Sequence, residues 1–233
     1  MDTLAAREFP EIRRSILSYI KQAGSANIAE LSAELKVSYE AIRQQIVQLE
    51  KDGWIAARLE RASAGSKGGR PLKQYFLTTA GDHIFDKHYD QLAMELIGAT
   101  ASTLGEDALK QLLAALTEKR VQHWAPRLQG MTLEQRLKAL RDIYLEDDPF
   151  MKVEKDGEDL YLIERNCPFI NVAHRYPMLC SVTVSTLSRL LGARVKREKK
   201  FQEGDGRCVF RVLKDQPIDN NGFWFELEED ERK

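Results

Sequence analysis

The stretch from Ile28 to Gly53 limits what this chain can fold into more than any other. Two runs of apolar residues recur there at helical spacing, and the short segment Lys36-Val37-Ser38 separates them. The spacing predicts two short helices joined by a tight turn, with Ser38 as the N-cap of the second helix and Gly53 just after its end. Such a pair is typical of the helix-turn-helix, whose second helix enters the major groove of DNA.

The polar side chains of the second helix are of the kinds that read base edges. Arginine and glutamine carry paired hydrogen-bonding groups that match purines in the major groove. An ordinary helical hairpin would show the same apolar pattern, so this helix alone does not decide between the two structures. The expected DNA contacts of the helix and its N-cap are Ser38, Tyr39, Arg43, Gln44 and Gln45.

The residues that follow favour DNA binding. Trp54–Leu59 and Lys73–Leu77 have the composition of strands, and the segment between them is rich in glycine and basic residues. Two strands around such a tip predict a wing, in which flanking glycine and proline let Arg70 approach a minor groove. The wing adds Lys67 and Arg70 to the expected contacts. Residues 1–80 are therefore predicted to form a winged helix-turn-helix domain.

Charge is unevenly distributed along the chain. The 233 residues together carry a net charge of −1, whereas residues 36–80 hold eight basic and four acidic side chains. A basic head on a weakly acidic chain suits a DNA-binding protein with one contact surface. No apolar run approaches the about 20 residues that cross a bilayer, and the polar N-terminus does not resemble a signal peptide. We therefore expect a cytoplasmic protein without membrane contact.

The middle of the chain is predicted to be helical. A long helix with an apolar face is expected from Asp82 to Ile97, followed by helices over Asp107–Trp124 and Thr132–Leu145. The first face has no partner in the local sequence, so we expect it to pack against a second copy of the chain. Burial against its own chain is the alternative. Residues 81–147 are interpreted as a helical connector that forms a homodimer.

Residues 148–226 are predicted to form a small α+β domain. Two pairs of strands lie on either side of one helix, Pro177–Leu191, which gives the order ββαββ. The basic run from Arg194 to Lys200 is interpreted as a charged edge strand rather than a second DNA surface. The acidic residues 227–233 are interpreted as a solvated tail. The fold class of the whole chain is thus α+β, with a winged head, a helical dimerisation connector and a ββαββ domain.

All three cysteines lie in the last domain, with twelve residues between Cys167 and Cys180 and 27 between Cys180 and Cys208. Their spread over three predicted elements fits a site assembled by the fold, although three buried hydrophobic residues are the plain alternative. Cys180 is expected at a helix N-terminus, where unpaired amides would lower the pKa of its thiol. Zinc or an iron–sulfur cluster would need a fourth ligand, for which His174 is the nearest side chain. The spacing does not choose between these metals.

Two segments of this domain, Asn166-Cys167-Pro168-Phe169 and Pro177-x-x-Cys180, resemble the SufR-type transcriptional regulators. The winged head and helical connector are similar as well, so the resemblance covers residues 10–213. Members of that family are dimeric repressors of iron–sulfur assembly genes and hold a cluster in the C-terminal domain. The resemblance implies that Cys167, Cys180 and Cys208 bind a cluster, [4Fe–4S] rather than [2Fe–2S]. The chain lacks the fourth cysteine that some members have.

These features predict a homodimeric repressor that binds an inverted-repeat operator in double-stranded DNA and senses an iron–sulfur cluster. A zinc- or thiol-redox-responsive regulator with the same head is the alternative. An enzyme is not expected, because no phosphate-binding glycine loop, Ser/His/Asp set or paired-carboxylate motif stands out.

Overall fold

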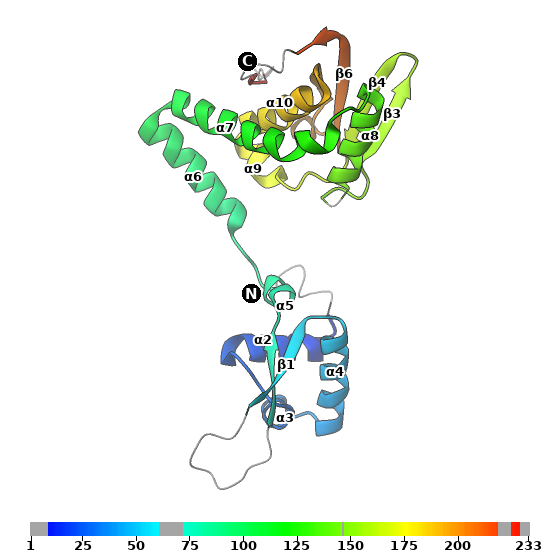
Figure 1. Cartoon of the computed structure of the whole chain (residues 1–233). Coiled ribbons are helices and arrows are strands. Elements are labelled where there is room, and N and C mark those ends of the chain that lie inside the picture. Colours follow the sequence, from blue (N-terminus) through cyan, green and yellow to red (C-terminus); the bar gives the residue numbers. More distant parts are fainter. Residues whose placement is uncertain (1–8, 61–71, 146, 219–224, 229–233) are drawn as a thin grey trace. The chain divides into compact units, whose positions relative to one another are not determined.

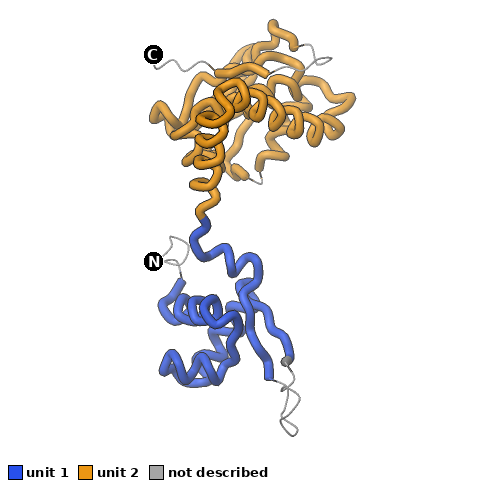
Figure 2. Tube along the Cα trace, turned by 90° about the vertical axis from the view of Figure 1, so that its left-hand side faces the viewer, with its two compact units in different colours: residues 1–87 blue, residues 88–233 orange. Residues whose placement is uncertain are grey.

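The computed structural model describes residues 9–60, 72–145, 147–218 and 225–228 (Figure 1). The chain divides into two compact units, residues 1–87 and 88–233 (Figure 2). Each unit has its own hydrophobic core, so the two are described separately. In the described part of the chain, no helix is both long and apolar enough to cross a membrane.

The first unit is a winged helix-turn-helix, as predicted. Asn27 caps the second of its helices through a capping box with Glu30, and Ser38 caps the third by accepting a hydrogen bond from the Ala41 amide. The apolar stripes of the three helices meet in one core in which Ile20, Leu31 and Ile46 are fully buried. The elements are α2 (Glu11–Ala23), α3 (Ile28–Leu35), α4 (Tyr39–Lys51), β1 (Ile55–Glu60), β2 (Leu72–Leu77) and α5 (Thr79–His83).

The prediction of one long helix from Asp82 to Ile97 is wrong. The chain instead forms the short helix α5, leaves the helical conformation, and starts α6 at Tyr89. The reason is that Ile84 packs into the core of the first unit rather than along α6. Gly81 holds α5 in place, since a Cβ atom there would lie 1.9 Å from the Trp54 carbonyl oxygen. The winged unit therefore includes α5 and the residues that follow it up to Lys87.

The second unit is an antiparallel sheet of strand order β3-β4-β6-β5 with helices packed on it. The predicted α+β fold class is confirmed, and β5 is an edge strand. The sequence predicts a two-residue turn at Asp156-Gly157 in the first hairpin. The structure has the turn one residue later, at Gly157-Glu158, because Asp156 pairs with Asp159. The elements are α6 (Tyr89–Leu104), α7 (Glu106–Trp124), η1 (Ala125–Leu128), α8 (Leu133–Tyr144), β3 (Lys152–Asp156), β4 (Asp159–Glu164), α9 (Ile170–Arg175), η2 (Pro177–Leu179), α10 (Cys180–Leu191), β5 (Ala193–Lys199), η3 (Phe201–Glu203) and β6 (Cys208–Pro217).

The helices predicted as a separate connector belong to the core of this second unit. Leu137 and Leu140 of α8 are fully buried in the same cluster as the sheet and α10. Leu109 and Leu113 of α7 pack against Val182 of α10. The sequence also did not predict α9, a helix of six residues. The helix predicted over Pro177–Leu191 is present as η2 followed directly by α10.

The face of the sheet that carries the core changes from apolar to polar at one end. Side chains alternate between the two faces of a strand, so every second residue points to the core. Along β4, β5 and β6 the buried core positions continue into an ionisable or thiol side chain, and Glu164 pairs directly with Cys208 across β4 and β6. The three sets, in order toward this end, are Leu160, Leu162 and Glu164; Ala193, Val195 and Arg197; and Val212, Phe210 and Cys208.

Candidate functional site

The three cysteines line one cavity at the polar end of the sheet. Cys167 follows β4, Cys180 is the first residue of α10, and Cys208 is the first residue of β6. The cavity has a volume of about 20 Å³. Within the described residues, no group of three or more His, Cys, Asp or Glu side chains could hold a metal ion in this structure. The cavity is completed by Glu164, Phe169, Ile170, Ala173, Leu179, Thr183, Arg197, Phe201, Gln202 and Phe210.

Burial dominates the electrostatics of the thiols. It raises the pKa of Cys167 to about 12 and that of Cys208 to about 11, and the neighbouring carboxyl of Glu164 adds to both shifts. Burial also raises the pKa of Cys180. The lowered pKa predicted for Cys180 is therefore wrong, because η2 leads directly into α10 and leaves no free helix end at the thiol. The three thiols are protonated at neutral pH in this structure.

Arg197 and Gln202 contact the thiols, and neither was predicted. The Arg197 guanidinium is buried and donates from Nη1 to the Cys208 sulfur at 3.7 Å and to Gln202 Oε1 at 3.3 Å. Gln202 Nε2 in turn donates to the Cys180 sulfur at 3.2 Å. The sequence places Arg197 on a charged edge strand, but on that strand it continues the inward positions of Ala193 and Val195. That alternation is the sequence signal that could have found it.

Glu164 is the second ionisable group of the cavity that sequence reasoning missed. Its carboxyl is buried, and burial followed by the charge of Asp148 raises its pKa to about 7. The cation that acts on it, Arg197, is already paired with Glu228. Among the residues that the structure describes, no basic side chain forms an ion pair with Glu164.

His174, the predicted fourth metal ligand, has no place at this cavity. It lies on α9, where it is exposed, whereas its neighbour Ala173 lines the cavity. The helix turns the two side chains in different directions, a relation that could not be known while α9 was not predicted. The structure therefore gives no support to His174 as a ligand.

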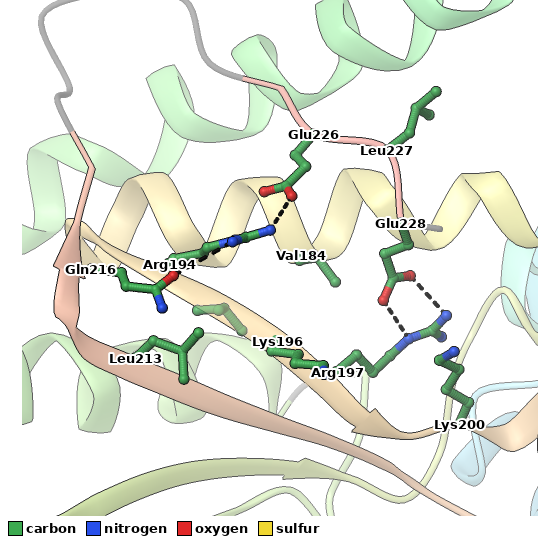
Figure 3. A pocket seen from close by; sticks show the side chains of 11 residues that line it. Val184, Arg194, Lys196, Arg197, Lys200, Leu213, Gln216, Glu226, Leu227 and Glu228 are labelled. Carbon is green, nitrogen blue, oxygen red and sulfur yellow. Dashed lines mark hydrogen bonds and ion pairs between the residues drawn. The ribbon is translucent and has the colours of Figure 1, made fainter. Parts of the chain in front are cut away.

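A second and larger cavity, of about 380 Å³, shares Arg197 with the cysteine cavity and is bounded by the C-terminal segment 225–228. Figure 3 shows Glu226 directed to Arg194 and Glu228 directed to Arg197. Glu228 binds Arg197 through two contacts, of 3.0 Å from Nε and 2.7 Å from Nη2. The prediction of a solvated tail from residue 227 is wrong at Leu227 and Glu228, because these residues are partly buried against α10 and β5.

Serines on α10 hold this segment by hydrogen bonds to its backbone. Ser181 Oγ accepts from the Glu228 amide at 2.9 Å, and Ser185 Oγ accepts from the Glu226 amide at 3.1 Å. Both serines are fully buried. The buried hydroxyls of Ser181 and Ser185 therefore have hydrogen-bond partners in the C-terminal segment, which a solvated tail would not provide.

The exposed face of α4 carries most of the predicted DNA contacts. Ser38, Tyr39, Arg43 and Gln44 are exposed, and Tyr39 shows 55% of its surface. Arg43 is held by Glu40 of the same helix, with contacts of 2.8 Å from Nε and 2.7 Å from Nη2. Both partners are exposed, so a base can replace Glu40 at modest cost.

Gln45 differs from this prediction. It is half-buried, and its Oε1 accepts a hydrogen bond from Arg13 Nε of α2 at 2.8 Å. The side chain is therefore directed to the neighbouring helix rather than outward. Lys67 and Arg70 lie in residues 61–71, outside the described part of the chain, and their contacts stay predictions.

Comparison with known proteins supports the first unit. Residues 12–96 match the family model of the winged helix DNA-binding domain. Among curated proteins none matches the chain significantly. A crystal structure of Bacillus subtilis PadR in complex with operator DNA is similar at 13% identity with a TM-score of 0.28, covering 78% of this chain and 98% of that one. At this TM-score the likeness says nothing about the function of this chain.

The winged helix DNA-binding domain exposes one residue on α4 that sequence reasoning missed. Val47 has 52% of its surface exposed and follows Tyr39 and Arg43 at intervals of four residues, so the three form one row on the helix. An exposed apolar side chain in this row suits contact with a thymine methyl group. Its position four residues after Arg43 on the same helix is the sequence signal that could have identified it.

Proposed function

We propose that this protein is a homodimeric transcriptional repressor of iron–sulfur cluster assembly genes. It binds an inverted-repeat operator in DNA through α4 and the wing, and it senses an iron–sulfur cluster through Cys167, Cys180 and Cys208. The observation that supports cluster binding most directly is that the three thiols, from three elements, line a single cavity. The family match and the exposed row on α4 support the DNA-binding part.

The side chains of the cavity suit a cluster chemically. Thiolates are the usual protein ligands of iron–sulfur clusters, and Arg197 places a positive charge beside Cys208 to offset theirs. A cavity of about 20 Å³ holds about one water-sized group, so binding a cluster requires its walls to move apart. The wall formed by Phe169, Ile170 and Ala173 belongs to the short α9 region. A bound cluster would supply a link between three chain segments that responds to oxidants and to iron supply.

A regulator that binds one zinc ion is the second candidate function. The small volume of the cavity favours it, because a single ion requires less movement of the walls than a cluster. A thiol-redox switch is less favoured, since the raised pKa values of Cys167 and Cys208 keep the reactive thiolate scarce.

Metal analysis of anaerobically purified protein separates these functions. The proposal expects a brown protein with broad visible absorption and with iron and acid-labile sulfide in equal amounts. Zinc without visible absorption would support the second candidate instead. A colourless protein that binds neither, even after anaerobic reconstitution with iron and sulfide, would contradict both.

Homodimer formation is proposed to use the exposed apolar face of α6. Leu92 and Leu96 show 54% and 60% of their surfaces, and within the described residues none on α6 is buried. A row of exposed leucines one helical turn apart is the pattern by which helices pair.

Replacing Leu92 and Leu96 together with glutamate should therefore convert the dimer into a monomer without unfolding it. Light scattering checks the mass, and circular dichroism checks the fold. Gln91→Glu adds charge on the same helix and should leave the dimer intact. A wild-type protein that is monomeric at micromolar concentration would rule out this interface.

A further inference from the structure

The larger cavity, of about 380 Å³, is bounded by β5 and by the C-terminal segment 225–228. Binding sites for small molecules typically have volumes of roughly 300–1,000 Å³, so this cavity can hold an organic ligand of modest size. Figure 3 shows Arg194 and Arg197 extending from β5 toward Glu226 and Glu228 of the segment. The cavity is thus present while the segment is bound, and a ligand can enter without displacing it.

Basic side chains outnumber acidic ones in the lining of this cavity by four to two. Both arginines of the lining pair with carboxylates of the segment, and Lys200 pairs with Glu203 at 3.0 Å. Lys196 is the remaining cation, and among the residues that the structure describes its ammonium group has neither a hydrogen bond nor an ion pair. The cavity therefore offers a positive charge that no described side chain neutralises.

Arg194 and Lys196 form the part of the lining that a carboxylate can bind. Alternate residues of a strand point to the same side, so these two exposed side chains are neighbours on one face of β5. The pair of Arg194 with Glu226 is also exposed, and exposed pairs exchange partners at little cost. Arg197 is instead buried and held by Glu228 through two contacts. A carboxylate in the cavity can thus bind Lys196 and share Arg194 with Glu226.

The remaining surface of the cavity is largely aliphatic. Val184 of α10, Val195 of β5, Leu213 of β6 and Leu227 of the segment supply hydrocarbon from four parts of the fold. Within the described chain, no aromatic side chain lines the cavity. Hydrocarbon of a ligand gains free energy when it leaves water for such a surface. The lining therefore suits a molecule that joins a carboxylate to an aliphatic chain.

We propose that this cavity binds a small aliphatic carboxylic acid in its ionised form. The carboxylate binds Lys196 and Arg194, and the hydrocarbon chain packs against the four aliphatic side chains. Arg197 lines both this cavity and the one beside the cysteines, but the acid needs no metal ion to bind. This site is therefore independent of the proposed cluster, and either can fail without the other.

Calorimetric titration of the full-length protein with hexanoate tests this site. Binding should saturate at one hexanoate per chain. Acetate keeps the charge but lacks the chain, and hexanamide keeps the chain but lacks the charge, so each should bind at least about tenfold more weakly. All titrations use the same ionic strength, because salt screens exposed charges.

Four variants locate the binding. Lys196→Gln should weaken hexanoate binding at least about tenfold, the scale of a hydrogen bond to a charged group, and Lys196→Arg should keep most of the affinity. Lys199→Gln removes a charge from the same strand outside the lining and should bind as wild type. Leu227→Ala should weaken the binding of hexanoate but not of acetate. Circular dichroism verifies that each variant is folded.

Three outcomes would overturn the inference. The first is a wild-type protein that shows no saturable binding of hexanoate, butanoate or octanoate. The second is equal affinity for acetate and hexanoate, which would leave a site for charge alone. The third is an equal loss in Lys196→Gln and Lys199→Gln, which would show a general effect of charge rather than binding in this cavity. None of them bears on whether the protein binds a cluster.

Discussion

Replacing Arg197 with alanine should lower the free energy of unfolding of the second unit by about 3–5 kcal/mol, the cost typical of removing one partner of a buried ion pair. The guanidinium and the Glu228 carboxylate are both largely buried and form two contacts. Without Arg197, the carboxylate is left unpaired in a site that already raises its pKa by burial. Cys208 and Gln202 lose a hydrogen-bond donor as well.

The same strand offers a matched control for this prediction. Arg194 pairs with Glu226 of the same C-terminal segment, but both side chains are exposed. Arg194→Ala should therefore cost only about 0–1 kcal/mol. Chemical denaturation of each variant measures the difference. The double variant Arg197→Ala/Glu228→Ala should recover part of the loss, because it removes the unpaired charge. Equal effects of Arg194→Ala and Arg197→Ala would contradict the buried role of Arg197.

The second large effect concerns DNA recognition. Arg43→Ala should lose about 1–3 kcal/mol of discrimination between the operator and a sequence changed at one base pair, if Arg43 binds a guanine through both nitrogens. The Arg43 guanidinium binds the Glu40 carboxylate through two nitrogens in this structure. Glu40→Ala removes that partner, so it should not weaken operator binding. Gel-shift titrations with both DNA sequences measure the discrimination.

A control for this prediction is Gln45→Ala, because Gln45 is directed to Arg13 of α2 and should not contact a base edge. If Arg43→Ala discriminates between the two DNA sequences as well as the wild-type protein does, the recognition surface lies elsewhere.

Arg70→Ala should weaken binding most at A·T-rich flanks, if the wing enters a minor groove.

Local patterns predicted the elements whose cores are built from regular apolar spacing. The stripe Ile42, Ile46 and Leu49 gives α4 its buried side, and the capped helix from Thr132 appears as α8. The break before α6 was not predictable in this way. Ile84 continues the helical spacing toward Tyr89, but its tertiary contacts are with the first unit. Sequence spacing alone does not show which core an apolar residue joins.

The candidate site was predicted only in part, for a similar reason. The cysteines drew attention because of their chemistry and their shared domain. Glu164, Arg197 and Glu228 are charged residues of the kind usually found on a surface, and their burial follows from strand register and from the C-terminal segment. His174 was preferred because of its chemistry, but the turn of α9 exposes it.

Operator affinity measured with and without the cluster tests the central claim most directly. Fluorescence anisotropy under anaerobic conditions would compare reconstituted wild type, chelator-treated wild type, and the single variants Cys167→Ser, Cys180→Ser and Cys208→Ser. A coupling of about 1–3 kcal/mol predicts that loss of the cluster changes operator affinity by roughly 5–150-fold. Each serine variant should lack the cluster and show the affinity of the chelator-treated protein. Identical operator affinity of the reconstituted and chelator-treated wild type would contradict cluster sensing, and a serine variant with a normal cluster would remove that cysteine from the ligand set.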